Sequence, residues 1–289
     1  MTDAAQPGEL GNALRPLTNQ EPESLDQSSR QALTLLDYPH HIPDSAPEPV
    51  GGFEGEFAHA ERIQVACVFI QLGCIVRDME LTKHTHATVA LEKDGASLVI
   101  DPGAYTPNSA ELVAGTSAVL VTHDHPDHFD AGILNAALAA QPELRVWAPA
   151  SVVDALDSGD GRVVAVSAGD SFTAAGFEIT TVGEHHAPIH QDLPPMDNVG
   201  FIVDGSVYHP GDSYFVPEAD VDILLLPTSG PWAKLGEGVD FVRAVAPSRT
   251  IQIHDLMLSD AGRGLFTQTI SGLSGIPLET LELGQTVTV

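Results

Sequence analysis

Positive charge is scarce in this sequence. Its 289 residues include 12 lysines and arginines against 40 aspartates and glutamates, which gives a formal net charge of −28. A protein that binds the phosphate backbone of a nucleic acid needs a basic surface, and so does one that docks on anionic lipid. We therefore expect neither a nucleic acid nor a membrane as a partner.

Cysteines and long apolar runs are also few. Cys67 and Cys74 are the only cysteines, too few for a disulfide scaffold. The first ten residues contain two acids and no lysine or arginine, unlike the basic start of a signal peptide. The longest apolar run, 63–76, is interrupted by two glutamines and is too short to cross a bilayer core of about 30 Å. These absences favour a soluble, cytoplasmic protein.

The composition and the hydrophobic pattern of the sequence change near Met79. Residues 1–78 contain 12 acidic and 4 basic residues, many prolines and little sustained hydrophobic period. Such a segment can bury little apolar surface, so we predict a disordered or weakly ordered acidic N-terminal extension. Residues 79–289 are predicted to form one folded domain. Because no other methionine follows Met1 before it, Met79 is also a hypothetical start of the natural protein.

Beyond Met79, short apolar runs alternate with helical patterns. Hairpin signals such as Lys93-Asp94-Gly95 and Asp204-Gly205 follow or separate several of the runs. Many hairpins with helices between them are typical of two sheets covered by helices, so we predict an α+β fold. The predicted strands are 81–91, 97–100, 118–122, 145–148, 177–182, 199–203, 206–209, 223–226, 250–253 and 280–289, and the predicted helices are 129–140, 150–157, 238–245 and 260–271.

One segment carries most of the chemical information. Residues 123–128 read His-Asp-His-Pro-Asp-His and follow a predicted apolar strand. Five of these six side chains can bind a metal ion, and imidazole and carboxylate suit zinc and related divalent ions. On an extended loop, His123 and His125 project to one side, while Asp127 and His128 reach a neighbouring point. The segment therefore predicts a metal site at the end of a buried strand.

The pattern His-x-His-x-Asp-His after an apolar strand resembles the signature of the metallo-β-lactamase superfamily. The resemblance extends over residues 79–289, and the other motifs of that superfamily match in the right order. They fall at Asp101, His186, Asp212 and His254. The chain is most similar to the small ascorbate-6-phosphate lactonase-like branch. The resemblance implies an αββα sandwich, in which two mixed β-sheets are covered by helices.

The resemblance also implies two divalent metal ions, zinc in the first place, with manganese and iron(II) as alternatives. The superfamily's ligand pattern falls on His123, His125 and His186 for the first ion, on Asp127, His128 and His254 for the second, and on Asp212 as a bridge. Asp127 and Asp212 are expected to be the catalytic carboxylates. A metal can lower the pKa of a bound water from about 15.7 to near 7. The implied activity is hydrolysis of a small ester, lactone, amide or phosphodiester by a metal-bound hydroxide.

Three alternatives stay open in the sequence. His185 and His186 are adjacent and only one can be the ligand, although the small residue Ala187 favours His186 by the superfamily's pattern. A mononuclear iron oxygenase of the persulfide-dioxygenase kind shares the pattern at 123–128 and is the alternative function. A metal-stabilised binding module is disfavoured because no predicted ligand is missing. The expected partner is a small-molecule substrate, with a homo-oligomer as an open alternative.

Several other residues are expected near the site without being ligands. Asp101 is expected to support a ligand rather than to bind metal, and His209 and Asp255 flank ligands that they could orient. For the pocket wall, the alternative to a role in the site is ordinary packing or exposure. The candidates for that wall are His86, on one strand face with His84, together with His190 and Trp232.

Overall fold

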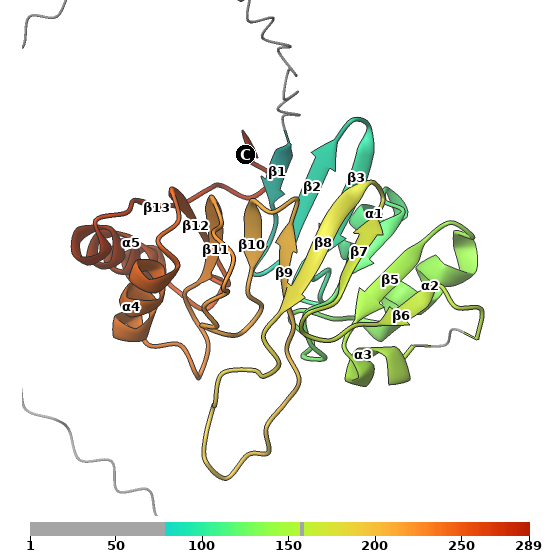
Figure 1. Ribbon diagram of the computed structural model, residues 1–289, viewed down its shortest axis with the longest axis horizontal. Helices are drawn as coiled ribbons and strands as arrows, with labels where there is room; N and C mark the ends of the chain where they lie inside the picture. The colour runs from blue at the N-terminus through green and yellow to red at the C-terminus, as the bar shows by residue number, and fades with distance from the viewer. Residues whose placement is uncertain (1–78, 157–158) are drawn as a thin grey trace, which may run out of the picture. The chain divides into compact units, whose positions relative to one another are not determined.

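The computed structural model describes residues 79–156 and 159–289. Residues 1–78 lie outside the described part, so the predicted extension, the apolar run at 63–76 and the hypothetical start at Met79 all stay predictions. The described residues form two β-sheets that pack face to face, with helices on their outer faces (Figure 1).

The first sheet is mixed and has seven strands in the order β14-β1-β2-β3-β4-β5-β6. β1 pairs antiparallel with β14 and with β2, and β2 pairs antiparallel with β3, whereas β3 to β6 are parallel. The strands are β1 (Glu80–Lys83), β2 (Val89–Lys93), β3 (Ala96–Ile100), β4 (Ala118–Leu120), β5 (Arg145–Ala148), β6 (Val163–Ala165) and β14 (Thr286–Thr288).

The second sheet is also mixed and has seven strands in the order β13-β12-β11-β10-β9-β8-β7. β7 to β10 form antiparallel pairs, and β10 to β13 are parallel. The strands are β7 (Ser171–Ala174), β8 (Phe177–Val182), β9 (Gly200–Val203), β10 (Val207–His209), β11 (Ile223–Pro227), β12 (Arg249–Ile253) and β13 (Leu278–Glu279).

Three apolar clusters hold the layers together. The largest lies between the sheets and joins residues such as Leu98 and Ile100 of β3 to Phe177 and Ile251 of the second sheet. A second cluster packs three helices against the first sheet, and a third cluster packs two helices against the second sheet. The arrangement is an αββα sandwich, so the predicted α+β fold class is confirmed. The helices are α1 (Ser109–Ala114), α2 (Ala131–Ala140) and α3 (Ala150–Asp154) on the first sheet, and α4 (Leu235–Val245) and α5 (Asp260–Ser274) on the second.

The predicted strand 81–91 is wrong as one continuous element. β1 ends at Lys83 and β2 begins at Val89, and between them Thr88 N donates to Thr85 O across a tight turn (3.1 Å). His86 within this turn has a φ of 61°, a left-handed conformation foreign to strands. Residues 82–86 are all polar, and polar residues occur in strands as well as in turns, so the sequence does not mark the break. The expectation that His84 and His86 share a strand face is therefore also wrong.

The remaining differences concern short elements and ends. The predicted strand 280–289 is wrong over most of its length, because only Thr286–Thr288 pairs, after a turn in which Gln285 N donates to Glu282 O (2.9 Å). The sequence did not predict α1, β6, β7 or β13, which are only 6, 3, 4 and 2 residues long. Such short elements carry too few residues for a hydrophobic period to appear.

Candidate metal centre

The loops that follow β3, β4, β8, β10 and β12 carry all the motifs singled out in the sequence. The loop after β4 is folded tightly, because His128 N and Phe129 N both donate to His125 O (3.0 and 2.9 Å). Asp130 then caps α2 by accepting from Ile133 N (3.0 Å). The loop after β3 packs directly against the loop after β4, so closely that a Cβ atom on Gly103 would overlap the backbone carbonyl of Asp127. These contacts fix the backbone from which the predicted ligands project.

The first group of ligand-type side chains joins three different loops. It comprises His123, His125, His186 and Asp212, whose nearest ligand atoms all lie within 4.8 Å of one another. His123 Nε2 is 3.0 Å from His125 Nδ1, and His186 Nε2 is 3.3 Å from Asp212 Oδ2. Three of the four are buried, and His125 is half-buried. The group could hold one metal ion.

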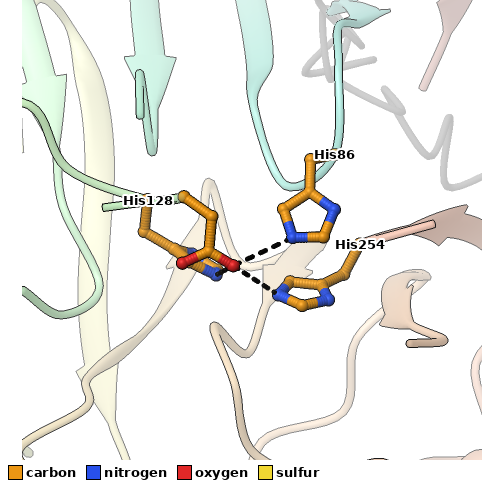
Figure 2. A group of neighbouring side chains, drawn as sticks. His86, His128 and His254 are labelled. Atoms are coloured by element: carbon orange, nitrogen blue, oxygen red, sulfur yellow. Dashed lines mark hydrogen bonds and ion pairs between the residues drawn. The ribbon is translucent and has the colours of Figure 1, made fainter. Parts of the chain in front are cut away.

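The second group lies beside the first. It comprises His86, Asp127, His128 and His254, with ligand atoms again within 4.8 Å of one another. Figure 2 shows the side chains of His86, His128 and His254 directed toward one another. Asp127 Oδ2 lies 3.0 Å from His86 Nε2 and 3.4 Å from His254 Nε2. His128 Nε2 is 3.8 Å from the same oxygen. This group could hold a second metal ion, and it contains one histidine more than the sequence pattern named.

Asp212 faces both groups. Its Oδ1 lies 3.1 Å from His128 Nε2 and 3.0 Å from His254 Nε2. Its Oδ2 lies 3.3 Å from His186 Nε2 and accepts a hydrogen bond from Trp232 Nε1 (2.9 Å). One carboxylate therefore spans the space between the two groups, as a bridging ligand would.

Unpartnered buried atoms test whether these residues suit a metal. Buried polar atoms in native proteins nearly always have partners, and exceptions need an explanation. Seven buried side-chain atoms of the described residues have none, and five of the seven belong to this site. They are His128 Nε2, His186 Nε2, Asp212 Oδ1 and both ring nitrogens of His254. Imidazole and carboxylate lone pairs that converge without a partner fit bound divalent cations.

Hydrogen bonds on the far side of the rings decide which nitrogen faces the site. His128 Nδ1 lies 2.7 Å from Asp101 Oδ2 and His186 Nδ1 lies 2.6 Å from Ala187 O, and both oxygens can only accept. Each Nδ1 therefore carries the proton, which leaves the Nε2 lone pair free for a metal. Asp101 also accepts from Thr122 N and Thr122 Oγ1 (both 2.8 Å). Both oxygens of the Asp101 carboxylate therefore make hydrogen bonds to the loop that carries the ligands. Supporting a ligand in this way is the role expected from the sequence.

The His86 ring carries its proton on the other nitrogen, Nε2. Its Nδ1 accepts from Leu256 N (3.3 Å), so the proton of the neutral ring is on Nε2, which donates to Asp127 Oδ2. Its backbone carbonyl accepts from His254 N (2.8 Å). His86, Asp101 and His254 all have φ between 52° and 61°. Left-handed residues other than glycine are costly and gather at functional sites, which agrees with three of them here.

Burial and charge set the protonation of the site. Burial by itself would raise the pKa of Asp212, but the charges of His128 and His254 outweigh it and hold this pKa well below its usual range. In the same way, hydrogen bonds from His254 and His86 outweigh burial and lower the pKa of Asp127. Burial lowers the pKa of His123, with a further contribution from His128. The carboxylates are thus ionised and His123 is neutral, the forms that bind metal. Burial by itself would lower the pKa of His128 and of His254, but Asp212 together with Asp101 or Asp127 outweighs it and raises both. A cation bound here would take the place of the added proton on each ring.

The structure separates the two adjacent histidines. His186 is buried in the first group, whereas the side chain of His185 is 68% exposed and lies 4.0 Å from Glu184. His190, a candidate for the pocket wall, is 59% exposed and accepts from Asp192 N (3.2 Å). Asp124 is exposed and belongs to neither group. His185, His190 and Asp124 therefore lie outside the cluster of side chains.

The flanking residues support the site from behind. His209 Nε2 donates to Ala87 O (2.9 Å) and lies 3.9 Å from Asp101, so it contacts the support rather than a ligand. Asp255 pairs with Lys83 Nζ (3.0 Å), which is fully buried at the end of β1. Sequence reasoning missed Lys83. A lysine is almost never fully buried unless it is paired, and because residues 82–86 are all polar, no local pattern marked this one as buried.

Comparison with known proteins defines the family. A model described as a beta-lactamase superfamily domain matches residues 80–254, more than half of the chain, so the protein belongs to this superfamily. Protein Rv0786c of Mycobacterium tuberculosis is 33% identical over 215 residues, which cover 73% of this chain and 100% of that protein. The UPF0173 metal-dependent hydrolase MK1542 of Methanopyrus kandleri is 28% identical over 207 residues, which cover 61% of this chain and 84% of that protein.

Solved structures agree on the fold. Igni18, a metallo hydrolase of Ignicoccus hospitalis, has a TM-score of 0.58 at 19% identity and covers 73% of this chain and 98% of its own. The metallo-beta-lactamase fold protein YhfI of Bacillus subtilis has a TM-score of 0.59 at 15% identity and covers 74% of this chain and 100% of its own. The predicted superfamily is confirmed by the family match, and these structures share the predicted fold. Within the described residues, no helix is long and apolar enough to cross a membrane.

Proposed function

We propose that this protein is a binuclear hydrolase that cleaves a small ester, lactone, amide or phosphodiester. The observation that carries the proposal is Asp212, whose two carboxylate oxygens face different groups of histidines. When bound, the two cations would supply a water that is acidic enough to ionise near neutral pH and a Lewis acid for the carbonyl or phosphoryl oxygen. The relatives named as metal-dependent hydrolases support the same class of reaction.

The side chains divide between two ions. Asp212 would contact both, and its position beside both groups is the basis for two ions rather than one. Both groups combine imidazole and carboxylate ligands, a set that suits zinc, with manganese and iron(II) as alternatives. The first ion would be held by His123, His125 and His186, and the second by Asp127, His128 and His254.

The chain's own contribution is to hold this constellation rigidly. Asp101 orients His128 through its Nδ1, and His86 orients Asp127 through its Nε2. Trp232 Nε1 donates to Asp212 Oδ2 and fixes the carboxylate that joins the groups. Outer contacts of this kind set ligand orientation and commonly affect metal affinity or activity about 10–100-fold. Trp232 is therefore proposed as a partner of a ligand, in addition to any part in the pocket wall.

The proposal also covers the protein's partners and its location in the cell. A net charge of −28 supports a small-molecule substrate and opposes nucleic acid and anionic membranes as partners. We further propose that the protein works in the cytoplasm, where reducing conditions suit a chain with only two cysteines. Fractionation of cells that produce the tagged protein tests the location, and recovery outside the cytoplasm contradicts it.

Metal analysis combined with activity tests the proposed function. The purified protein is loaded with zinc or manganese and assayed on 4-nitrophenyl acetate, γ-butyrolactone and bis(4-nitrophenyl) phosphate. We expect two ions per chain, hydrolysis of at least one probe, and loss of that hydrolysis in Asp212→Ala with the chain still folded. One iron per chain together with oxygen consumption would instead support the mononuclear oxygenase. Full activity of Asp212→Ala on a probe that the unchanged protein cleaves would contradict the binuclear assignment.

A further inference from the structure

An apolar cavity adjoins the candidate metal centre. It has a volume of about 310 Å³ and is formed by the long loop 183–199, which extends beyond the sheets from the ends of β8 and β9 (Figure 1). His186 lines the cavity and also belongs to the first group of ligand-type side chains. The cavity therefore opens beside the site where the reaction is proposed to occur. Its apolar lining comes from Pro188, Ile189, Leu193, Pro194 and Met196.

Exposed apolar side chains gather in the same loops. The described residues include nine large apolar side chains that are exposed, and six of them follow Asp101 or a ligand-type residue within its loop. A single exposed apolar residue needs no explanation, but a concentration around one site marks a binding surface. Tyr105 has its ring 5.7 Å from that of His86, and Phe215 packs against Gly183 at the base of the long loop. The six are Tyr105, Leu193, Phe215, Val216, Leu256 and Met257.

Cations that could receive a charged substrate are lacking at the same place. Of the residues described, no lysine or arginine lines the cavity. Basic residues close in sequence to the ligand-type residues of the site already have acidic partners: Lys83 pairs with Asp255, Lys234 with Glu237, Arg249 with Glu279, and Arg263 with Asp255 and Asp260. Phosphate groups are usually recognised by arginine or lysine. A phosphorylated substrate would therefore find no basic side chain in this cavity.

From these observations we infer that the substrate is a neutral ester or lactone with an apolar acyl chain, and that this chain lies in the cavity beside His186. The inference rests on the proposed hydrolase function and narrows it to one class of substrate. In the reaction, a hydroxyl group from water bonds to the acyl carbon, the bond from that carbon to the ester oxygen breaks, and the leaving oxygen takes the remaining proton. Burial of the acyl chain positions the carbonyl at the centre.

A series of substrates that differ only in chain length tests the inference. The zinc-loaded protein is assayed on 4-nitrophenyl acetate, butyrate, hexanoate and octanoate. We expect kcat/KM to rise about fourfold for each methylene group that enters the cavity. We also expect bis(4-nitrophenyl) phosphate, which is charged, to be cleaved more slowly than any of the esters. Equal kcat/KM values along the series would overturn the inference.

Matched variants locate the effect in the cavity. Leu193→Ser removes an apolar side chain from the lining, and Leu265→Ser removes a leucine of similar exposure, 58% against 54%, from α5. We expect Leu193→Ser to lower kcat/KM for octanoate about tenfold and to lower that for acetate by much less. Leu265→Ser is expected to change neither value. An equal loss for acetate and octanoate in Leu193→Ser would contradict a role in chain recognition.

A binding measurement separates this inference from the proposed function. Octanamide and acetamide are titrated into the protein without added metal by calorimetry, and only octanamide is expected to bind, more weakly in Leu193→Ser. If no ester is cleaved but octanamide binds, the hydrolase proposal fails and the apolar site stands. If esters are cleaved but octanamide does not bind, the apolar site fails and the hydrolase stands. If Leu193→Ser instead converts a dimer to a monomer in sedimentation, the surface is an interface between copies and the inference is overturned.

Discussion

At the scale of single residues, the adjacent histidines His185 and His186 have different surroundings. His186 is buried with its Nδ1 on Ala187 O and its Nε2 beside Asp212, whereas His185 is exposed. We expect His186→Ala to lose one of two bound metal ions and His185→Ala to keep both. Inductively coupled plasma mass spectrometry of the two purified variants measures this. Equal metal content in both would remove the basis for choosing His186.

His86 is the residue whose role the structure changes most. Its Nδ1 accepts from Leu256 N, so its Nε2–H points to Asp127 and holds that carboxylate. We expect His86→Ala to weaken binding of the second ion about 10–100-fold. Glutamine offers an N–H donor at a similar reach, so His86→Gln is expected to recover most of the loss. Competition with a chelating indicator measures both affinities, and identical values for the two variants would contradict a role as a donor.

Part of the site could be predicted because part of it is local. His123, His125, Asp127 and His128 lie within one loop, and their spacing alone places metal-binding atoms together. The contribution of Lys83 could not be predicted in this way. Its partner Asp255 is 172 residues away, and no local pattern reports a contact between a strand of one sheet and a loop of the other.

At the scale of elements, the sheet ends match prediction better than the turns between them. The strand predicted at 177–182 is found unchanged as β8, because its apolar and polar residues alternate cleanly. In the segment 81–91, residues 82–86 are all polar, and Thr85 and Thr88 close a turn inside it. Periodicity reports which side chains are buried and does not report where the backbone turns. The site depends on that turn, since it places His86 beside Asp127.

The buried pair of Lys83 and Asp255 links two elements behind the site. Lys83 ends β1, and Asp255 follows His254 after β12. Loss of one partner leaves a buried charge uncompensated, which typically costs about 3–5 kcal/mol. We expect Lys83→Met to lower the free energy of unfolding toward the lower end of this range, because Asp255 keeps a contact with Arg263 at 3.4 Å.

Urea denaturation followed by circular dichroism measures the effect of Lys83→Met. Lys234→Met is the control, because its pair with Glu237 is exposed and such pairs contribute only about 0–1 kcal/mol. A change in Lys83→Met no larger than that of the control would show that the buried pair does not stabilise the fold.

At the scale of the whole molecule, the first and last strands of the described domain pair with each other next to Met79. The side chain of Met79 is buried, its carbonyl accepts from Val289 N (2.8 Å), and β1 lies between β2 and β14. We therefore expect a chain that begins at Met79 to fold and to bind two metal ions. Thermal melting compares it with the full chain. A fall in Tm of several degrees, or insolubility, would show that residues before Met79 stabilise the domain.

The central claim is that Asp212 lies between two metal ions. Anomalous diffraction at the zinc absorption edge, from crystals of the zinc-loaded protein, tests it most directly. We expect two anomalous peaks, one beside His123, His125 and His186 and one beside Asp127, His128 and His254, with Asp212 in contact with both. A single peak at full occupancy, or two peaks of which only one contacts Asp212, would contradict the binuclear centre.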